Sequence, residues 1–329
     1  MDSSQDDFPA SLMIKNDHYC ELRYGENPHQ TAALYADPTV QEANVVSALQ
    51  LNPTAKELSY NNYNDSDGAL NLIKEFKQPA AAIIKHANPA GCAVAKTISE
   101  AYAKALSTDP MSAFGGVVAL NQECDVKTAE QIVSSFKEVV VAPSYTEDSL
   151  NILRTKKNLR ILSVGELNSP SVTLVEKPIV GGRLIQQRDL SSLSSKDLQV
   201  VTKIEPTPAQ IETMLFAWKV VKHVKSNAIV FATGTETVGL GMGQVSRVDA
   251  VRLASIKAVE HSENKTPKGA VMASDAFFPF PDALENAAEA GISAVIQPGG
   301  SINDDAVIDA ANNLDISMVF TGTRCFKHD

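Results

Sequence analysis

Short apolar runs alternate along this chain with stretches whose apolar residues recur at helical spacing. The short runs indicate buried strands, and the amphipathic stretches between them indicate helices. The first half predicts strands at 80–84, 117–120, 139–142 and 159–164, and helices near 67–76, 97–107, 126–136 and 146–154. Strands that alternate with helices at this spacing are typical of an α/β protein with a mostly parallel or mixed sheet. The polar residues 58–65 predict a loop before the first helix.

The second half repeats the pattern. Thr207-Pro208-Ala209-Gln210 predicts a helix start, with an N-cap threonine, a proline at the first helical position and a capping-box glutamine. A turn at 233–235 between two apolar runs predicts a hairpin, and Ser246 is expected to cap the next helix. The series ends with predicted helices at 283–290 and 304–312 and strands at 292–296 and 316–320.

The two halves therefore echo each other, and the echo predicts two related α/β subdomains. We expect an N-terminal tail over 1–20, a first subdomain over 21–195 that carries a Lys-His pair, and a second subdomain over 196–329. The serine-rich segment 191–195 is the linker candidate. Residues 172–188 predict an extended excursion broken by two glycines.

The Lys85-His86 pair stands at the end of the apolar run 80–84. Ligands of α/β proteins bind at the carboxyl ends of strands. Neighbouring strand residues point to opposite faces, so the pair can share a target only where strand geometry breaks, and Asn88-Pro89 is expected to supply that break. The alternative is a strand that ends in two solvated polar residues.

Composition and charge narrow the function classes. Hydrophobic residues make up 44% and charged residues 21%, as in an ordinary globular protein. The net charge of −10 argues against a general nucleic-acid surface and against anionic membranes, but it permits one local positive pocket. No apolar run is long enough to span a bilayer, and the acidic N-terminus does not resemble a secretory signal. The four cysteines lack metal-ligand spacing and indicate free thiols in a reducing cytoplasm.

Common catalytic motifs are missing from the sequence. A zinc deaminase needs H-x-E with a downstream P-C-x-x-C, whereas His86 is followed by Ala-Asn and no two cysteines are close. There is no Walker A loop and no G-x-S-x-G elbow. Gly-Leu-Gly-Met-Gly at 239–243 imitates a dinucleotide loop, but its third glycine falls too early. Residues 23–29, Arg-Tyr-Gly-Glu-Asn-Pro-His, predict an irregular turn. The arginine of this turn could bind a phosphate or carboxylate group through two hydrogen bonds. The alternative is an ordinary surface loop with an exposed arginine.

Taken together, nine segments closely resemble the AICAR transformylase family. They are LRYGENPHQ, LSYNN, IIKHANPAG, DPMSAFGG, VKSNAIVFA, GMGQVSRV, ASDAFFPF, VIQPGGSI and the closing TRCFKH, in the order of the family. They extend from about residue 8 to the end of the chain. Each motif alone is weak, whereas nine in order are specific.

The resemblance implies two tandem cytidine-deaminase-like three-layer subdomains without a zinc site. It implies formyl transfer from the co-substrate 10-formyltetrahydrofolate to the 5-amino group of AICAR, with no bound cofactor, in a cytoplasmic homodimer whose active sites lie at the interface. The IMP cyclohydrolase domain of the family is expected to be absent, with 8–12 as the end of its connection, so ring closure is expected of a separate protein.

The resemblance also carries roles onto residues of this sequence. His86 is expected to be the general base, Lys85 to stabilise the oxyanion, and Asn227 to hold the formyl group or folate N10. AICAR is expected to meet Arg23, Tyr24, Glu138, Arg247, Phe277 and Arg324, with the first and last of these on its phosphate. Folate is expected to meet Met111, Phe114, Val248, Pro279, Asp282 and Ser301.

Some positions depart from the family pattern. Pro281 replaces an arginine, Met242 replaces an alanine, and Asp329 extends the usual C-terminus. None of these removes a proposed catalytic residue. Two other functions remain open at this point: a catalytically silent folate- or nucleotide-binding module, and a deaminase-like hydrolase that would require zinc.

Overall fold

The computed structural model describes residues 8–171 and 174–328. The expectations for residues 1–7 of the tail and for Asp329 lie outside these ranges. The strands of the first half are β1 (Asp17–Leu22), β2 (Ala32–Ala36), β3 (Leu49–Gln50), β4 (Ala80–Lys85), β5 (Asn88–Val94), β6 (Val117–Leu120), β7 (Val139–Ala142) and β8 (Arg160–Ser163). Its helices are α1 (Tyr60–Ile73), α2 (Ile98–Leu106), α3 (Pro110–Ala113), α4 (Val126–Val133) and α5 (Glu147–Arg154).

A hairpin of β9 (Leu174–Ile179) and β10 (Gly182–Gln187) and a short 3₁₀ turn, η1 (Ser195–Asp197), lead into the second half. The strands there are β11 (Gln199–Val200), β12 (Ile229–Thr233), β13 (Glu236–Gly241), β14 (Val271–Ser274), β15 (Ala294–Gln297) and β16 (Ser317–Phe320). The helices are α6 (Pro208–Val221), α7 (Arg247–Glu260), α8 (Asp282–Glu289) and α9 (Asp304–Asn313).

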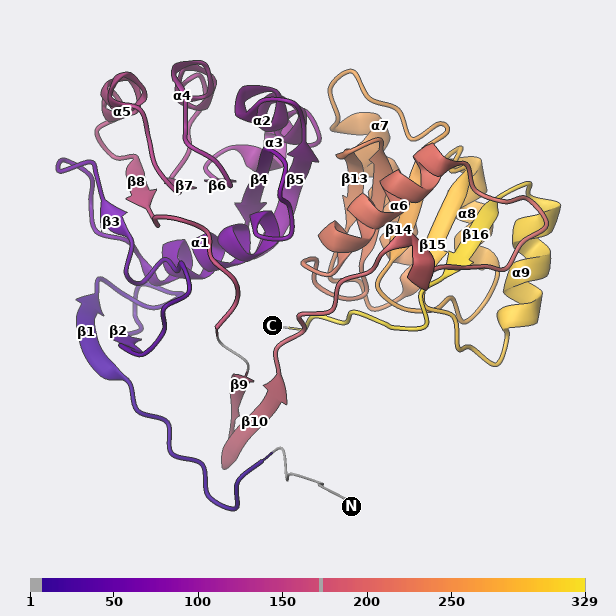
Figure 1. The fold of residues 1–329 in the computed structure, drawn as a ribbon, viewed down its shortest axis with the longest axis horizontal. Coiled ribbons are helices and arrows are strands. Elements are labelled where there is room, and N and C mark those ends of the chain that lie inside the picture. The colour runs from indigo at the N-terminus through magenta and orange to yellow at the C-terminus, as the bar shows by residue number, and fades with distance from the viewer. Residues whose placement is uncertain (1–7, 172–173, 329) are drawn as a thin grey trace.

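One twelve-stranded sheet runs through both halves in the order β11-β16-β15-β14-β12-β13-β5-β4-β6-β7-β8-β3. Read outward from its centre, each half has an antiparallel hairpin, then three parallel strands, then a short antiparallel edge strand. The predicted mixed α/β sheet is confirmed, and the two strand series have the same order and directions. Figure 1 shows them side by side, with the first half in indigo to magenta and the second in orange to yellow.

Helices cover both faces of the sheet. The apolar side chains of Ala82, Ile84 and Val230 belong to a core shared with α1 and α6. Their neighbours Ile83 and Phe231 point the other way, into separate cores beneath the helices of the first and the second half. This alternation is the two-residue period of a strand that is buried on both faces, and it explains why these segments read as continuous apolar runs.

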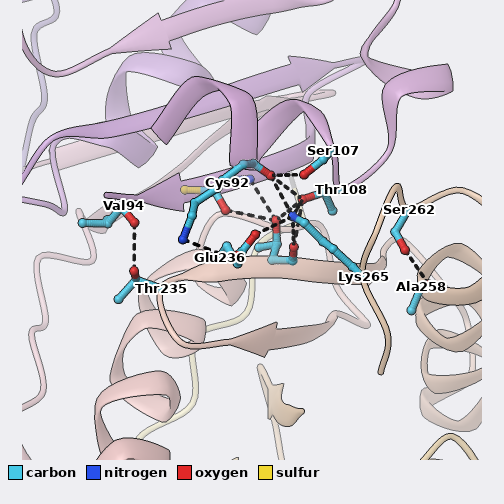
Figure 2. A network of polar contacts seen from close by, with 11 residues as sticks. Cys92, Val94, Ser107, Thr108, Thr235, Glu236, Ala258, Ser262 and Lys265 are labelled. Carbon is cyan, nitrogen blue, oxygen red and sulfur yellow. Dashed lines mark hydrogen bonds and ion pairs between the residues drawn. The ribbon is translucent and has the colours of Figure 1, made fainter. Parts of the chain in front are cut away.

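Side chains join the two halves where the backbone ladder is thin. In the described part of the chain, β5 and β13 share a single residue pair in ladder register. Thr237 Oγ1 accepts a hydrogen bond from the Cys92 N–H (3.0 Å) and donates one to its carbonyl oxygen (3.1 Å). Lys265 reaches from the second half to Thr108 (3.0 Å) and pairs with Glu236 (3.1 Å), as Figure 2 shows. These contacts fix β4 and β5 relative to β12 and β13.

The segment after the Lys-His pair differs from the prediction. The turn is His86-Ala87, where both residues have positive φ (53° and 59°), and Pro89 lies inside β5. Two consecutive positive φ values make the type I′ hairpin turn, which usually shows itself through Asn or Gly. Because His-Ala carries no such signal, the sequence pattern missed the hairpin. Gly91 also lies in β5, where an added Cβ would come within 2.0 Å of the Ala105 carbonyl oxygen of α2.

Two other predictions about local structure differ from the structure. The polar segment 58–65 is mostly the start of α1, because Ser59 and Asn62 form a capping box that outweighs the low helix propensity of the asparagines. Residues 17–20 of the expected tail belong to β1, which pairs with β2. The predicted extended excursion over 172–188 is broken at Gly181 (φ 86°) as expected, and its described residues form the β9–β10 hairpin.

The glycine run at 239–243 is a packing feature of β13. An added Cβ at Gly241 would lie 1.8 Å from the Ala250 carbonyl oxygen of α7, and one at Gly239 would lie 2.2 Å from that of Ala254. The glycines therefore let α7 pack directly on the strand. Ser246 caps α7 by accepting a hydrogen bond from the Asp249 N–H (3.3 Å), as predicted.

Candidate active site

Strand directions bring distant segments to one edge of the sheet, which we call the site edge. β4, β5, β13 and β12 alternate in direction, so the turn after β4 lies at the same edge as the start of β12. β6, β7 and β8 begin at this edge because β6 is antiparallel to β4. β14, β15 and β16 end there because β14 is antiparallel to β12. The site edge therefore collects strand starts from one half and strand ends from the other.

Lys85 and His86 lie at the end of β4 on this edge. The Lys85 ammonium donates a hydrogen bond to the Gly115 carbonyl oxygen (3.0 Å), while His86 is exposed. Asp65 of α1 accepts a hydrogen bond from the Ala87 N–H (2.7 Å) and so holds the turn. Burial raises the pKa of Asp65, and the backbone N–H groups of Ala87 and His86 and the nearby Lys85 ammonium oppose that effect. The turn thus presents both side chains from a fixed backbone.

A second group gathers at the starts of β7 and β8, where Arg23, Tyr24 and Glu138 lie close enough to Arg160 to influence its pKa. The Glu138 carboxylate accepts a hydrogen bond from the Asn62 side chain of α1 (2.8 Å). The Arg23 guanidinium lies 4.9 Å from the Tyr24 ring centroid and donates to its hydroxyl (3.1 Å). Arg160 is buried, and burial lowers its pKa while the nearby Glu138 carboxylate opposes that effect. Two arginines, a tyrosine and a carboxylate are groups that can bind a phosphorylated sugar and base.

In the second half, the partly buried Asn227 forms a network with the buried Arg247 and Asp275. Arg247 pairs with the fully buried Asp275 and donates to Asn227 Oδ1 (2.6 Å) and to Ser274 Oγ (2.9 Å). The Asn227 amide donates to two backbone carbonyl groups, at 2.9 and 3.0 Å. Asp275 also accepts from the Ser226 hydroxyl and the Ala228 N–H. The orientation of the Asn227 amide is therefore fully specified.

Direct contacts connect the Lys-His turn to this network. The Lys225 N–H donates to Asn88 Oδ1 (3.0 Å), and Asn88 stands two residues after His86. The C-terminal segment joins the same place, because Ser226 and Lys327 exchange hydrogen bonds of 2.8 and 3.0 Å. In Figure 1 the yellow segment that follows β16 accordingly runs back toward the region between the two halves. Arg324 is exposed, with its guanidinium 4.8 Å from the Phe326 ring centroid.

The residues expected to meet folate lie in two separate places. Met111 and Phe114 are 72% and 61% exposed in the α3 segment. Pro279, Asp282 and Ser301 lie in the second half, where Asn303 connects their loops by donating to the Pro279 carbonyl oxygen (2.7 Å). Within the described ranges, no hydrogen bond or ion pair joins these two groups. Phe277 (37% exposed) and Val248 also lie in the second half.

Three residues of the site escaped sequence analysis. Asp65 lies in the polar segment 58–65, whose pattern predicts a loop, whereas the structure places it in α1, where it accepts from the Ala87 N–H. Asp275 sat inside the ASDAFFPF motif but offered no sign of its burial. Arg160 gave no local signal, because its role depends on the neighbouring strand, where its backbone N–H donates to the Glu138 carbonyl oxygen (3.1 Å).

Among residues 8–171 and 174–328, no three His, Cys, Asp or Glu side chains lie close enough to share a metal ion. No helix in those same ranges is both long and apolar enough to cross a membrane.

Comparisons with known proteins agree with the resemblance. The sequence profile of the AICARFT/IMPCHase bienzyme family matches residues 1–257. The chain is 49% identical over 326 residues to the bifunctional purine biosynthesis protein PurH of Acetivibrio thermocellus, covering 98% of this chain. It is 50% identical over 330 residues to the protein of the same name from Magnetococcus marinus, again covering 98% of this chain. The chain spans 62% of the length of each relative. The chain therefore belongs to the AICARFT/IMPCHase bienzyme family.

Proposed function

We propose that this chain transfers a formyl group from 10-formyltetrahydrofolate to the 5-amino group of AICAR in purine biosynthesis, giving formyl-AICAR and tetrahydrofolate. The observation that carries the proposal is the joining of the Lys85-His86 turn to the Asn227 network at one sheet edge. That edge belongs to a chain about half identical to PurH proteins.

The chemistry needs a base. The amine of AICAR is conjugated with an imidazole that bears a carboxamide, so it is a poor nucleophile until it loses a proton. A neutral imidazole can accept that proton as a general base. His86 is exposed to an incoming substrate, and its backbone is held by the hydrogen bond between Ala87 and Asp65. We assign the base to His86.

The chemistry also needs a cation for the developing oxyanion. As the amine nitrogen attacks, the formyl C=O becomes a tetrahedral alkoxide. Its collapse breaks the bond from carbon to folate N10, and N10 takes up the proton that the amine lost, which gives tetrahydrofolate. The Lys85 ammonium has one hydrogen bond to a neutral carbonyl oxygen and two further N–H donors. We assign oxyanion stabilisation to Lys85.

We assign substrate recognition to Asn227, whose side chain Arg247 holds in place by donating a hydrogen bond to its Oδ1. Both amide N–H groups of Asn227 already have backbone acceptors, so the second lone pair of its Oδ1 remains to accept from the substrate amine or folate. Arg247 is buried against Asp275, so we place it as a positioning residue rather than a direct nucleotide contact. Arg23 and Arg324 keep exposed guanidinium groups for the phosphate.

We propose that the site is completed by a second copy of the chain. Large apolar side chains with no cover surround the site edge, including Met111, Phe114, Val245 (102% exposed), Phe280 and Ile302 (99% exposed). Exposed apolar groups gathered in this way are typical of an interface. In a homodimer, the folate residues of the first half of one copy could face those of the second half of the other copy across one site. We also propose that each half has a cytidine-deaminase-like fold and that the protein is cytoplasmic.

Product analysis tests the proposed function. The purified chain is incubated with AICAR and 10-formyltetrahydrofolate that carries an isotopic label in the formyl group. Formyl-AICAR that contains the label, detected by mass spectrometry, is the expected result. AICAR that stays unmodified while both ligands bind by calorimetry would instead support the catalytically silent binding module.

A further inference from the structure

A cleft of about 360 Å³ opens beside the site edge, between the α4–β7 and α5–β8 connections. Its lining includes the lysines Lys137, Lys156 and Lys157 and the hydroxyl groups of Ser134, Ser135 and Thr155. None of the described residues that line it is Asp or Glu. The chain as a whole carries a net charge of −10, so a cleft whose described lining has three cations and no carboxylate is a local positive region that favours anions.

The burial of Lys137 without a carboxylate partner in the described ranges is a second, independent observation. Lys137 is only 4% exposed, and its ammonium contacts Ser135 Oγ at 2.5 Å and the Phe136 carbonyl oxygen at 3.5 Å. Among the described residues it has no carboxylate partner. Burial lowers its pKa to about 8, so it is still mainly cationic at pH 7.

Other buried lysines of this protein are paired differently. Lys74, Lys222, Lys257 and Lys265 are each less than a fifth exposed, and each contacts a carboxylate at 2.6–3.1 Å. A buried cation without a counter-charge is costly unless another anion supplies it. The uncompensated ammonium of Lys137 thus points to an external anion.

The cleft is directly connected to the proposed folate side of the active site. The Phe136 ring, which lines the cleft, packs at 5.5 Å from the Phe114 ring. The Phe136 carbonyl oxygen accepts from the Gly115 N–H (2.8 Å), and the Gly115 carbonyl oxygen accepts from Lys85 (3.0 Å). A group bound in the cleft would therefore lie next to Phe114, one of the residues proposed to contact folate.

We propose that this cleft binds an anion with two or more carboxylate or phosphate charges, held by Lys137 at its base and by Lys156 and Lys157 at its mouth. Two sources share this chemistry. One is the chain of glutamate carboxylates on a polyglutamyl folate, and this source rests on the proposed function. The other is a free phosphate-type anion.

Calorimetry on the full chain tests the site without requiring turnover. The probes are inorganic pyrophosphate and γ-linked triglutamate. We expect at least one of them to bind and binding to weaken with salt. Lys156→Ala/Lys157→Ala and, separately, Lys137→Met should each weaken it by about tenfold or more, as the loss of a charge-assisted hydrogen bond does. The matched control is Lys77→Ala/Lys203→Ala, which removes two exposed lysines outside the cleft and should leave binding unchanged.

Folates of different length then separate the two sources. If triglutamyl folate binds more tightly than monoglutamyl folate, and Lys156→Ala/Lys157→Ala abolishes the difference, the cleft holds the folate tail. If only pyrophosphate responds to the substitutions, the cleft holds a free anion. Absence of binding by both probes, or binding that the three substitutions leave unchanged while the variants stay folded by circular dichroism, overturns the proposal. Failure of the proposed function is a different result, because it leaves these binding constants intact and removes only tetrahydrofolate formation.

Discussion

The buried pair of Arg247 and Asp275 gives the sharpest test of how the second half holds Asn227. We predict the effect of Asp275→Ala. Asp275 is fully buried and accepts hydrogen bonds from Arg247, Ser226 and the Ala228 N–H. Without the Asp275 carboxylate, the buried guanidinium of Arg247 keeps only neutral hydrogen-bond acceptors among the described residues. The nearer ones are Asn227 Oδ1 and the Ser274 hydroxyl.

The expected loss follows from that geometry. Breaking a buried ion pair from one side costs about 3–5 kcal/mol, because a charge stays buried without compensation. Removing both charges is less costly, so Asp275→Ala/Arg247→Met should be destabilised by clearly less than the sum of the single variants. The difference should be at least about 1 kcal/mol, since directly contacting residues are coupled.

The assay is urea unfolding followed by tryptophan fluorescence and circular dichroism. The matched control is the ion pair of Asp249 and Arg252 on α7. Its charged atoms lie 3.2 Å apart, and its side chains are 52% and 58% exposed. Asp249→Ala should cost less than about 1 kcal/mol. Equal losses for the buried and the exposed aspartate, or strictly additive losses in the buried pair, would refute this account of the network.

Four further predictions test other parts of the structure. His86→Ala should lower kcat by about 10²–10⁴-fold while AICAR binding measured by calorimetry is retained. Lys85→Met should lower kcat by about 10²–10³-fold, measured as initial rates at saturating substrates, because one oxyanion donor is lost. Gly241→Ala should destabilise the chain by about 3 kcal/mol in urea unfolding, since its Cβ would overlap the Ala250 carbonyl oxygen of α7. Burial raises the pKa of Glu42, but hydrogen bonds from Arg188 and Lys74 outweigh this and set it at about 2, below the ordinary 4.5. The stability that this carboxylate adds is therefore fully present above about pH 4.5 and disappears as the pH falls toward 2, and Glu42→Gln should flatten acid unfolding curves in that window.

Much of the fold could be predicted because its strands are buried on both faces. Continuous apolar runs such as Val117–Leu120 and Val139–Ala142 have few alternatives to a buried strand, and the structure has strands with those bounds. The capping box at Thr207 marks the start of α6 in the same local way. These signals need only the residues within one element.

The missed features depend on neighbours that are distant in sequence. The β4–β5 hairpin uses a His-Ala turn that carries no glycine signal, and its strand contains Pro89, which the pattern assigned to a turn. Gly91 and Gly241 make sense only once α2 and α7 pack against them. Whether a glycine serves a turn or a helix contact cannot be read from its own segment.

The candidate site divides in the same way. The motif segments identify Lys85, His86 and Asn227 as candidates in the sequence. The structure connects their loops through a hydrogen bond between Asn88 and Lys225. Their supporting residues, such as Asp65 and Asp275, gave no signal because a carboxylate looks the same in a sequence whether it is buried or solvated. The assigned roles of the site residues and the domain boundary at 195/196 stay predictions.

The most direct test of the central claim is tetrahydrofolate formation, followed by absorbance after AICAR is added to the purified chain with 10-formyltetrahydrofolate. The account predicts AICAR-dependent release by the unmodified chain and almost none by His86→Ala, although both bind AICAR equally. Release by His86→Ala at the unmodified rate, or no release by a chain that binds both substrates as a dimer, would contradict it.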